Sequence, residues 1–174
     1  LMGERRLVSE NRELQEFFDI VTIYEDVATM ARKFVDPRVR VKSIKAYAMW
    51  LAPFERFIWL DFDSRPCSGD FAAKLFTELE SRDVDALLHN QWPAHQSLLS
   101  RDHDDHYHIE HNSAIAVFDK RRPGSRAALA LFARAFDTFE PASKRDQPPL
   151  MVALRLAFKY QGFSHYDLPP HTFC

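Results

Sequence analysis

The sequence predicts an α/β domain, in which strands alternate with helices around a layered core. Short runs rich in β-branched and aromatic residues alternate along the chain with segments whose apolar residues recur at helical spacing. The chain has 174 residues, of which 46% are hydrophobic, and this is enough for one domain with a substantial core. Because no internal repeat or boundary interrupts the pattern, we expect a single domain over 1–174.

The first fifty residues predict three helices and one strand. Residues 1–18 are charged with a modest apolar side, and residues 19–24 contain the β-rich run Ile-Val-Thr-Ile. A helix over 25–34 follows, with Pro37 expected to close that region. Apolar residues at helical spacing then predict a helix over 43–51.

The middle of the chain predicts a strand, a helix and a second strand. Residues 57–60 are Phe-Ile-Trp-Leu, and an uninterrupted apolar run of this kind is typical of an interior strand buried on both faces. The next helix is expected to start near Pro66 and Ser68, with Ser68 as its N-cap. Residues 85–89 then form a short strand.

The last part of the chain opens with residues 90–110, a long polar segment of little periodicity, and such segments are often functional. Beyond it we expect regular structure again. The expected elements are a strand over 112–118, a turn at Pro123-Gly124, a helix over 125–136, a helix capped by Asp146, and a strand over 165–168.

Two carboxylates follow the apolar run directly, in Asp61-Phe62-Asp63-Ser64. In extended backbone, residues two apart point the same way, so Asp61 and Asp63 are expected to share one side at the strand's carboxyl end. That end is where open α/β sheets bind ligands. A hard divalent cation relieves the repulsion between two carboxylates, and we therefore expect a metal-diphosphate site. The alternative is a strand that ends in an ordinary polar turn.

Composition narrows the classes of partner. The net charge of −2 gives no electrostatic case for nucleic acid, and no apolar run is long enough to span a membrane. No signal peptide is visible, so a complete chain would be cytoplasmic, whereas a fragment of a longer chain leaves the compartment unknown. Cys67 and Cys174 match no metal or redox spacing.

The order of several short motifs resembles that of nucleotide-diphospho-sugar transferases, glycosyltransferases of the GT-A type with a DxD motif. The agreement runs from about residue 17 to the end. The motifs, in chain order, are Lys45-Ala46, Pro53-Phe54, the strand through Asp61 and Asp63, Leu75-Phe76, Glu110-His111-Asn112-Ser113-Ala114, Asp146-Gln147 with Leu150, and Leu168-Pro169.

The resemblance implies a GT-A-like, Rossmann-like fold with a mixed, mostly parallel sheet flanked by helices. From the resemblance we also expect this chain to lack the family's usual first strand–helix unit. The implied activity is metal-dependent transfer of a sugar from a nucleotide-diphosphate donor to a glycan, protein or small-molecule acceptor. The chain would then be a single glycosyltransferase-like domain, either complete or part of a longer protein.

The resemblance also implies a metal shell of Mn²⁺ or Mg²⁺, the ions that accept carboxylate and phosphate oxygens. Asp63 would bind the ion directly. Asp61 would reach the ribose, or the ion through a water molecule. His171, near the end of the chain, would complete the shell.

The remaining implied roles concern the donor and the acceptor. Lys45 would neutralise phosphate as a point charge, the alternative being an exposed helix lysine. Asn112 and Ser113 would hydrogen-bond sugar hydroxyls, the alternative being ordinary polarity at a strand end. Asp146, beside Gln147, would activate the acceptor as a base, the alternative being a helix cap.

The segment 101–111 is rich in histidine and aspartate and raises the question of zinc. Its histidines are His103, His106, His108 and His111. Side chains of this kind bind zinc, but the segment has no Cys and no helical register, which favours a solvated loop on the acceptor side.

Two other functions fit the same residues. In a haloacid-dehalogenase-type phosphohydrolase, Asp61 would be the nucleophile and Asp63 the general acid, although the sequence offers no convincing downstream acidic pair. A non-catalytic, degenerate transferase domain is favoured by the short N-terminal part and by Ala114, where the family usually has Gly.

Overall fold

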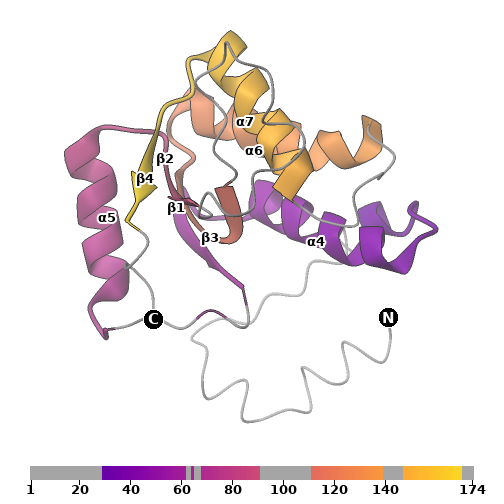
Figure 1. Ribbon diagram of the computed structural model, residues 1–174, viewed down its shortest axis with the longest axis horizontal. Coiled ribbons are helices and arrows are strands. Elements are labelled where there is room, and N and C mark those ends of the chain that lie inside the picture. Colours follow the sequence, from indigo (N-terminus) through magenta and orange to yellow (C-terminus); the bar gives the residue numbers. More distant parts are fainter. Residues whose placement is uncertain (1–28, 62–63, 65–67, 91–110, 139–146, 170–174) are drawn as a thin grey trace.

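The computed structural model describes residues 29–61, 64, 68–90, 111–138 and 147–169. Within these residues, four strands form one sheet, flanked by helices (Figure 1). The strands lie in the order β1 (Arg56–Leu60), β3 (His111–Asp119), β2 (Ala86–Asn90) and β4 (His165–Leu168). The α/β class and the four strands expected between residues 57 and 168 are therefore confirmed.

The sheet is mixed, and the expectation of a mostly parallel sheet is wrong for the described strands. β3 is antiparallel to both β1 and β2, and only the β2–β4 pair is parallel. β1 and β2 do run in the same direction, as a strand–helix–strand unit predicts. They are not neighbours, however, because β3 lies between them.

β1 lies at one edge of the described sheet, which differs from the interior strand expected from its apolar sequence. Only Phe57 of its five residues is buried, and Leu60 is 36% exposed. The side chain of Phe57 stacks on Phe118 of β3, with ring centroids 5.7 Å apart. An apolar run alone therefore did not determine how deeply this strand is buried.

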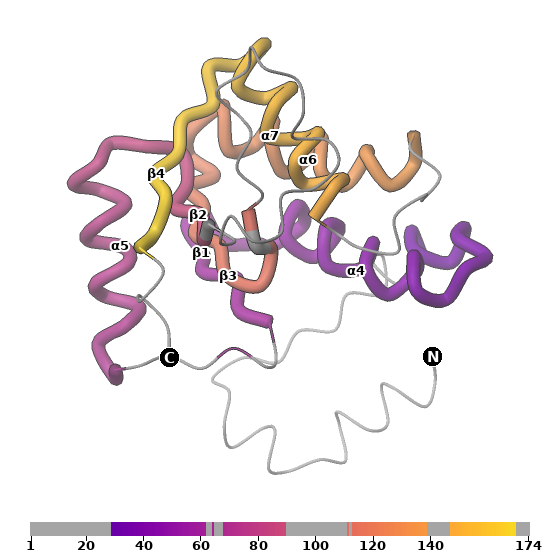
Figure 2. The backbone as a smooth tube through the Cα atoms, viewed as in Figure 1, coloured from indigo at the N-terminus to yellow at the C-terminus, as the bar shows by residue number. Residues whose placement is uncertain are grey.

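Helices cover both faces of the sheet (Figures 1 and 2). α5 (Phe71–Arg82) packs against the face that presents Leu87 and Val117. The opposite face carries a larger core, to which α4 (Pro37–Leu51), α6 (Pro123–Thr138) and α7 (Gln147–Gln161) contribute. None of the helices in the described part of the chain combines the length and apolar composition that a membrane crossing requires.

The helix starts differ from the sequence predictions in instructive ways. Pro37 begins α4 instead of closing the preceding region, because Asp36 is the N-cap and its carboxylate accepts the Arg38 N–H at 2.8 Å. Pro123 likewise begins α6, so the expected turn at Pro123-Gly124 is wrong. α5 begins at Phe71 with Asp70, and not Ser68, at the N-cap position.

One end of the sheet is held by Asp85, the residue before β2. Its buried carboxylate accepts the backbone N–H groups of Ser125, at 3.1 Å, and Ser164, at 2.9 Å. The first of these belongs to the start of α6 and the second precedes β4. Gly124 is required here, since a Cβ atom at that position would lie 2.8 Å from the Asp85 carboxylate oxygens. A single aspartate thus ties β2, β4 and α6 together.

Candidate functional site

At the opposite end of the sheet, the chain leaves β1 and enters β3 at the same place. β1 and β3 are antiparallel, so the carboxyl end of one meets the amino end of the other. The Asp61 N–H donates to the Ala114 carbonyl at 2.8 Å and extends the pairing one residue beyond the strand. This fixes Asp61 next to Ser113, two residues that are 52 positions apart in the sequence.

Lys45, on α4, joins these two residues. Its Nζ atom lies 2.8 Å and 2.9 Å from the two carboxylate oxygens of Asp61 and donates to the Ser113 Oγ at 3.1 Å. The residue is only 7% exposed, so it is a buried lysine and not an exposed helix lysine. Lys45, Asp61 and Ser113 together are called the strand-end site below.

Trp59 completes the surroundings of the Asp61 carboxylate. Its indole N–H donates to Asp61 Oδ1 at 2.7 Å, and the Lys45 ammonium lies 5.7 Å from the centre of its ring. Residues 59 and 61 are two apart, as the alternation of side chains along an extended segment would place them. The Asp61 carboxylate is therefore paired with the buried Lys45 ammonium and also accepts a hydrogen bond from the Trp59 indole.

The structure brings together Lys45, Asp61 and Ser113 of the residues singled out from the sequence. Asn112 lies in β3, where its backbone is paired with His89 of β2. Gln147 is the first residue of α7. One turn further, the Met151 Sδ accepts the His111 N–H at 3.5 Å, so this end of α7 lies near the start of β3.

Several of the predicted residues fall outside the described part of the chain. They are Asp63, Asp146 and His171, together with the histidines at 103, 106 and 108 and the elements expected over 1–18 and 19–24. The roles assigned to these residues stay predictions.

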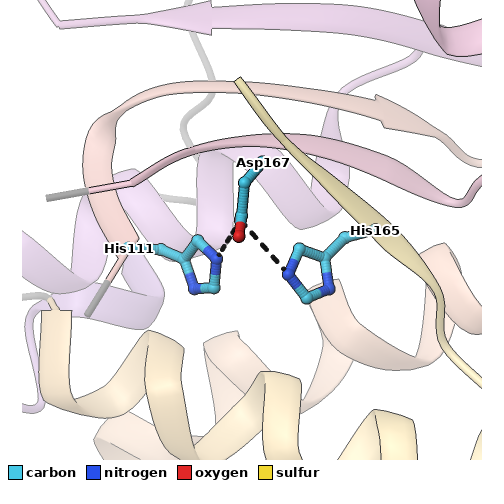
Figure 3. Close-up of side chains that lie close together, drawn as sticks. All are labelled: His111, His165 and Asp167. Atoms are coloured by element: carbon cyan, nitrogen blue, oxygen red, sulfur yellow. Dashed lines mark hydrogen bonds and ion pairs between the residues drawn. The ribbon is translucent and has the colours of Figure 1, made fainter. Parts of the chain in front are cut away.

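A second polar cluster consists of His111 on β3 and of His165 and Asp167 on β4 (Figure 3). We call it the histidine cluster. Asp167 lies between the two imidazole rings, with its Oδ1 2.8 Å from His111 Nε2 and 3.3 Å from His165 Nε2. The two rings meet edge to face, with centroids 4.8 Å apart. The three residues each offer one atom that can bind a metal ion, an imidazole nitrogen or a carboxylate oxygen, and these atoms all lie within 4.8 Å of one another.

Burial and hydrogen bonding set the charges in the histidine cluster. Burial of His111, which is 1% exposed, lowers the pKa of its imidazole, and the contact with Asp167 only partly opposes this. Burial by itself would raise the pKa of the Asp167 carboxyl, but the hydrogen bonds with His111 and His165 outweigh it and hold that pKa well below its usual value. The cluster therefore combines an ionised carboxylate with a neutral imidazole.

His165 and Asp167 belong to none of the candidate sites predicted from the sequence. The signal available was their spacing, since residues 165 and 167 of a strand share one face. Their partner His111 comes from another strand, β3. It lies one position before Asn112, the residue that pairs with His89 where the register between β2 and β3 shifts. Nothing local in the sequence indicates that this shift brings His111 towards Asp167.

Comparisons of the chain with protein-family models, with curated proteins and with solved structures found no match.

Proposed function

We propose that this protein is a metal-dependent glycosyltransferase with a GT-A-like arrangement, acting on a nucleotide-diphosphate sugar. The observation that supports the proposal is the strand-end site. Its three residues were selected from separate motifs of the sequence, at positions 45, 61 and 113, and they meet within hydrogen-bond distance at the carboxyl end of β1. That end of a strand is a common place for ligands in open α/β sheets.

Within this proposal, Lys45 holds Asp61 in position. Three N–H groups are available on its ammonium, and contacts to Asp61 and Ser113 engage them. The Lys45 side chain is 8% exposed, whereas that of Asp61 is 29% exposed, so Asp61 is the member that a ligand reaches directly. Lys45 then acts on the diphosphate as a fixed positive charge behind the carboxylate.

Asp61 has acceptor capacity left for a ligand. A carboxylate offers about four acceptor positions, of which Lys45 and Trp59 together engage three. The position on Oδ2 that none of the described residues engages suits a ribose hydroxyl or a water molecule bound to a metal ion. This fits the role expected for Asp61, and it leaves direct metal binding to Asp63.

The oxygen donors of this region suit Mn²⁺ or Mg²⁺, and Asp63 with Asp61 would hold the ion. When bound, such an ion stabilises the negative charge that develops on the departing diphosphate. In this proposal the chain's own residues orient the donor: Ser113 is placed near the sugar by its bond to Lys45, and Asp61 fixes the ribose. Asp146 would accept the acceptor's proton.

The proposal is tested by calorimetric titration of nucleotide diphosphates with and without Mn²⁺. The wild-type protein is expected to bind at least one of them only when Mn²⁺ is present. Asp63→Ala is expected to abolish this binding, while the control Asp70→Ala, which removes an exposed carboxylate paired with Lys74, leaves it unchanged. Equal binding by the wild type and Asp63→Ala would contradict the proposal.

Two activity assays separate the proposed function from its alternatives. In the absence of acceptor, an active glycosyltransferase slowly hydrolyses its sugar nucleotide. A degenerate domain that only binds the sugar nucleotide does not. A phosphohydrolase releases phosphate from a generic aryl phosphate, which the proposed enzyme leaves intact.

A further inference from the structure

The histidine cluster has the composition of a transition-metal site. Two imidazoles and one carboxylate converge from β3 and β4, and both Nε2 atoms approach the same oxygen of Asp167 (Figure 3). We propose that His111, His165 and Asp167 bind a zinc ion, as a site separate from the Mn²⁺ or Mg²⁺ proposed at Asp61 and Asp63.

The donor set selects the metal. Imidazole nitrogens with a carboxylate oxygen are typical ligands of Zn²⁺, which is bound at about 2.0–2.2 Å in tetrahedral geometry. Mn²⁺ and Mg²⁺ prefer sites made of oxygen, so the two proposed sites differ in the ion that they bind. Three protein ligands leave a fourth position for water or another donor.

Two of the three distances between ligand atoms are close to the value that zinc requires. Two ligands of one tetrahedral zinc ion lie about 3.4 Å apart, which follows from bonds of about 2.1 Å. The two His–Asp distances, 2.8 Å and 3.3 Å, fall near this value. All three ligand atoms already lie within 4.8 Å of one another, so binding needs only small movements of side chains. His165 and Asp167 are partly exposed, at 16% and 32%, which gives an ion a route to the site.

Hydrogen bonds account for only part of the arrangement. The contact with Asp167 engages His111 Nε2, but the Nδ1 of the same buried ring has no hydrogen-bond partner among the residues that the structure describes. A buried imidazole with one unsatisfied nitrogen is costly as a purely structural group. Metal binding by the Nε2 atom of His111 would explain why this ring is buried despite the unfavourable free energy of its unsatisfied Nδ1.

The ion would act on the strand-end site through β3. His111 and Ser113 are two residues apart on that strand, and His165 and Asp167 belong to β4. A zinc ion shared by these residues would fix the end of β3 relative to β4, and so would hold Ser113 in place.

The test is a calorimetric titration of the metal-free protein with Zn²⁺ in the absence of nucleotide. Because His103, His106 and His108 could bind zinc independently, the experiment uses a background in which all three are replaced by Gln. One zinc ion per chain is expected to bind. His165→Gln and Asp167→Asn are each expected to weaken binding at least about 10-fold. Both lie at partly exposed positions, which favours folding of the variants.

The control is His89→Gln, which removes another partly buried strand histidine from the same end of the sheet and is expected to leave zinc affinity unchanged. Replacement of Zn²⁺ by Co²⁺ provides a second measurement, since tetrahedral cobalt absorbs visible light and the absorption should vanish in Asp167→Asn. Zinc affinity equal in all variants, or no zinc binding by the background protein, would overturn the proposal. Asp63→Ala should bind zinc normally, so this proposal and the proposed function can fail independently.

Discussion

The two ends of the sheet each contain an aspartate held by several hydrogen bonds, but the donors differ in kind. At one end, the Asp85 carboxylate accepts two backbone N–H groups, from Ser125 and Ser164, and also the Ser164 hydroxyl. At the other end, Asp61 accepts side-chain donors from Lys45 and Trp59. Backbone donors must be satisfied in every folded molecule, whereas side-chain donors can change partners when a ligand arrives. The two backbone donors thus indicate that Asp85 holds the fold, whereas Asp61 is the aspartate that the proposed function makes available for binding.

The largest effect is expected at Asp85. Asp85→Ala removes the acceptor of two N–H groups, and each unsatisfied buried donor costs about 1–3 kcal/mol. We expect the free energy of unfolding, measured by urea denaturation, to fall by about 2–5 kcal/mol. Asp70→Ala, at an exposed helix end without a side-chain cap bond, should change it by less than about 0.5 kcal/mol. A similar result for both variants would remove the distinction between the two ends.

The same end can be tested without touching Asp85, by adding one methyl group. Gly124→Ala places a Cβ against the Asp85 carboxylate and should cost about 1–3 kcal/mol of stability. Gly69→Ala is the matched control, because nothing lies within 4 Å of a Cβ built there. Equal stability of the two glycine variants would show that the Asp85 end tolerates rearrangement.

At the strand-end site we expect a smaller loss of stability than for Asp85→Ala, together with a loss of nucleotide binding. Lys45→Met leaves the Asp61 carboxylate without its counter-charge. Because Asp61 is 29% exposed, water replaces part of the lost interaction, and we expect a loss of about 1–2 kcal/mol. Mn²⁺-dependent nucleotide binding should weaken at least about 10-fold, since the loss of a charge-assisted hydrogen bond costs about 1.5–3 kcal/mol.

The control for Lys45 is Lys74→Met, which removes an exposed lysine paired with Asp70 on α5. Thermal denaturation and calorimetry should both give wild-type values for this variant. A Lys45→Met protein that binds nucleotide as well as the wild type would exclude Lys45 from the site.

The smallest effect concerns Asp119, which lies at the Asp85 end and has donors of both kinds. The hydrogen bonds from the Arg121 guanidinium hold the pKa of the Asp119 carboxyl below its usual value of 3.8, and the Arg121 N–H adds to this. Arg121→Ala should cost about 0.5–1 kcal/mol at neutral pH, because Arg121 is 48% exposed.

The pH dependence of this difference has a definite sign. A carboxyl with a lowered pKa in the folded state stabilises the protein fully above the usual pKa, and the contribution is lost as pH falls through the lowered value. The gap between wild type and Arg121→Ala should therefore be constant from pH 7 to about 5 and shrink below about 3.8. A gap that grows in acid would contradict the assignment.

Local signals in the sequence predicted the described elements well, and long-range pairing was where they failed. Apolar runs and helical periodicity located the strands and helices, because these patterns reflect burial of one side of each element. The position of β3 between β1 and β2 could not be predicted, since it depends on contacts between residues more than 50 positions apart. The expected parallel pairing of neighbouring strands failed for this reason.

The two clusters show the same limit. Lys45, Asp61 and Ser113 could be selected because each belongs to a motif whose order resembles a known family. His165 and Asp167 share a strand face, but His111, the third member of the histidine cluster, comes from β3. Trp59 was assigned only to an apolar strand, although its spacing from Asp61 was compatible with the hydrogen bond between them.

The central place of β3 also bears on how the chain acquires its structure. β1 and β2 are synthesised first, yet among the described strands the antiparallel partner of each is β3, which is completed at Asp119. During synthesis, both strands therefore leave the ribosome with an unpaired edge, and their pairing must wait for more than 50 further residues in the case of β1. Sheets that close through such distant pairs assemble slowly and expose aggregation-prone edges while they wait.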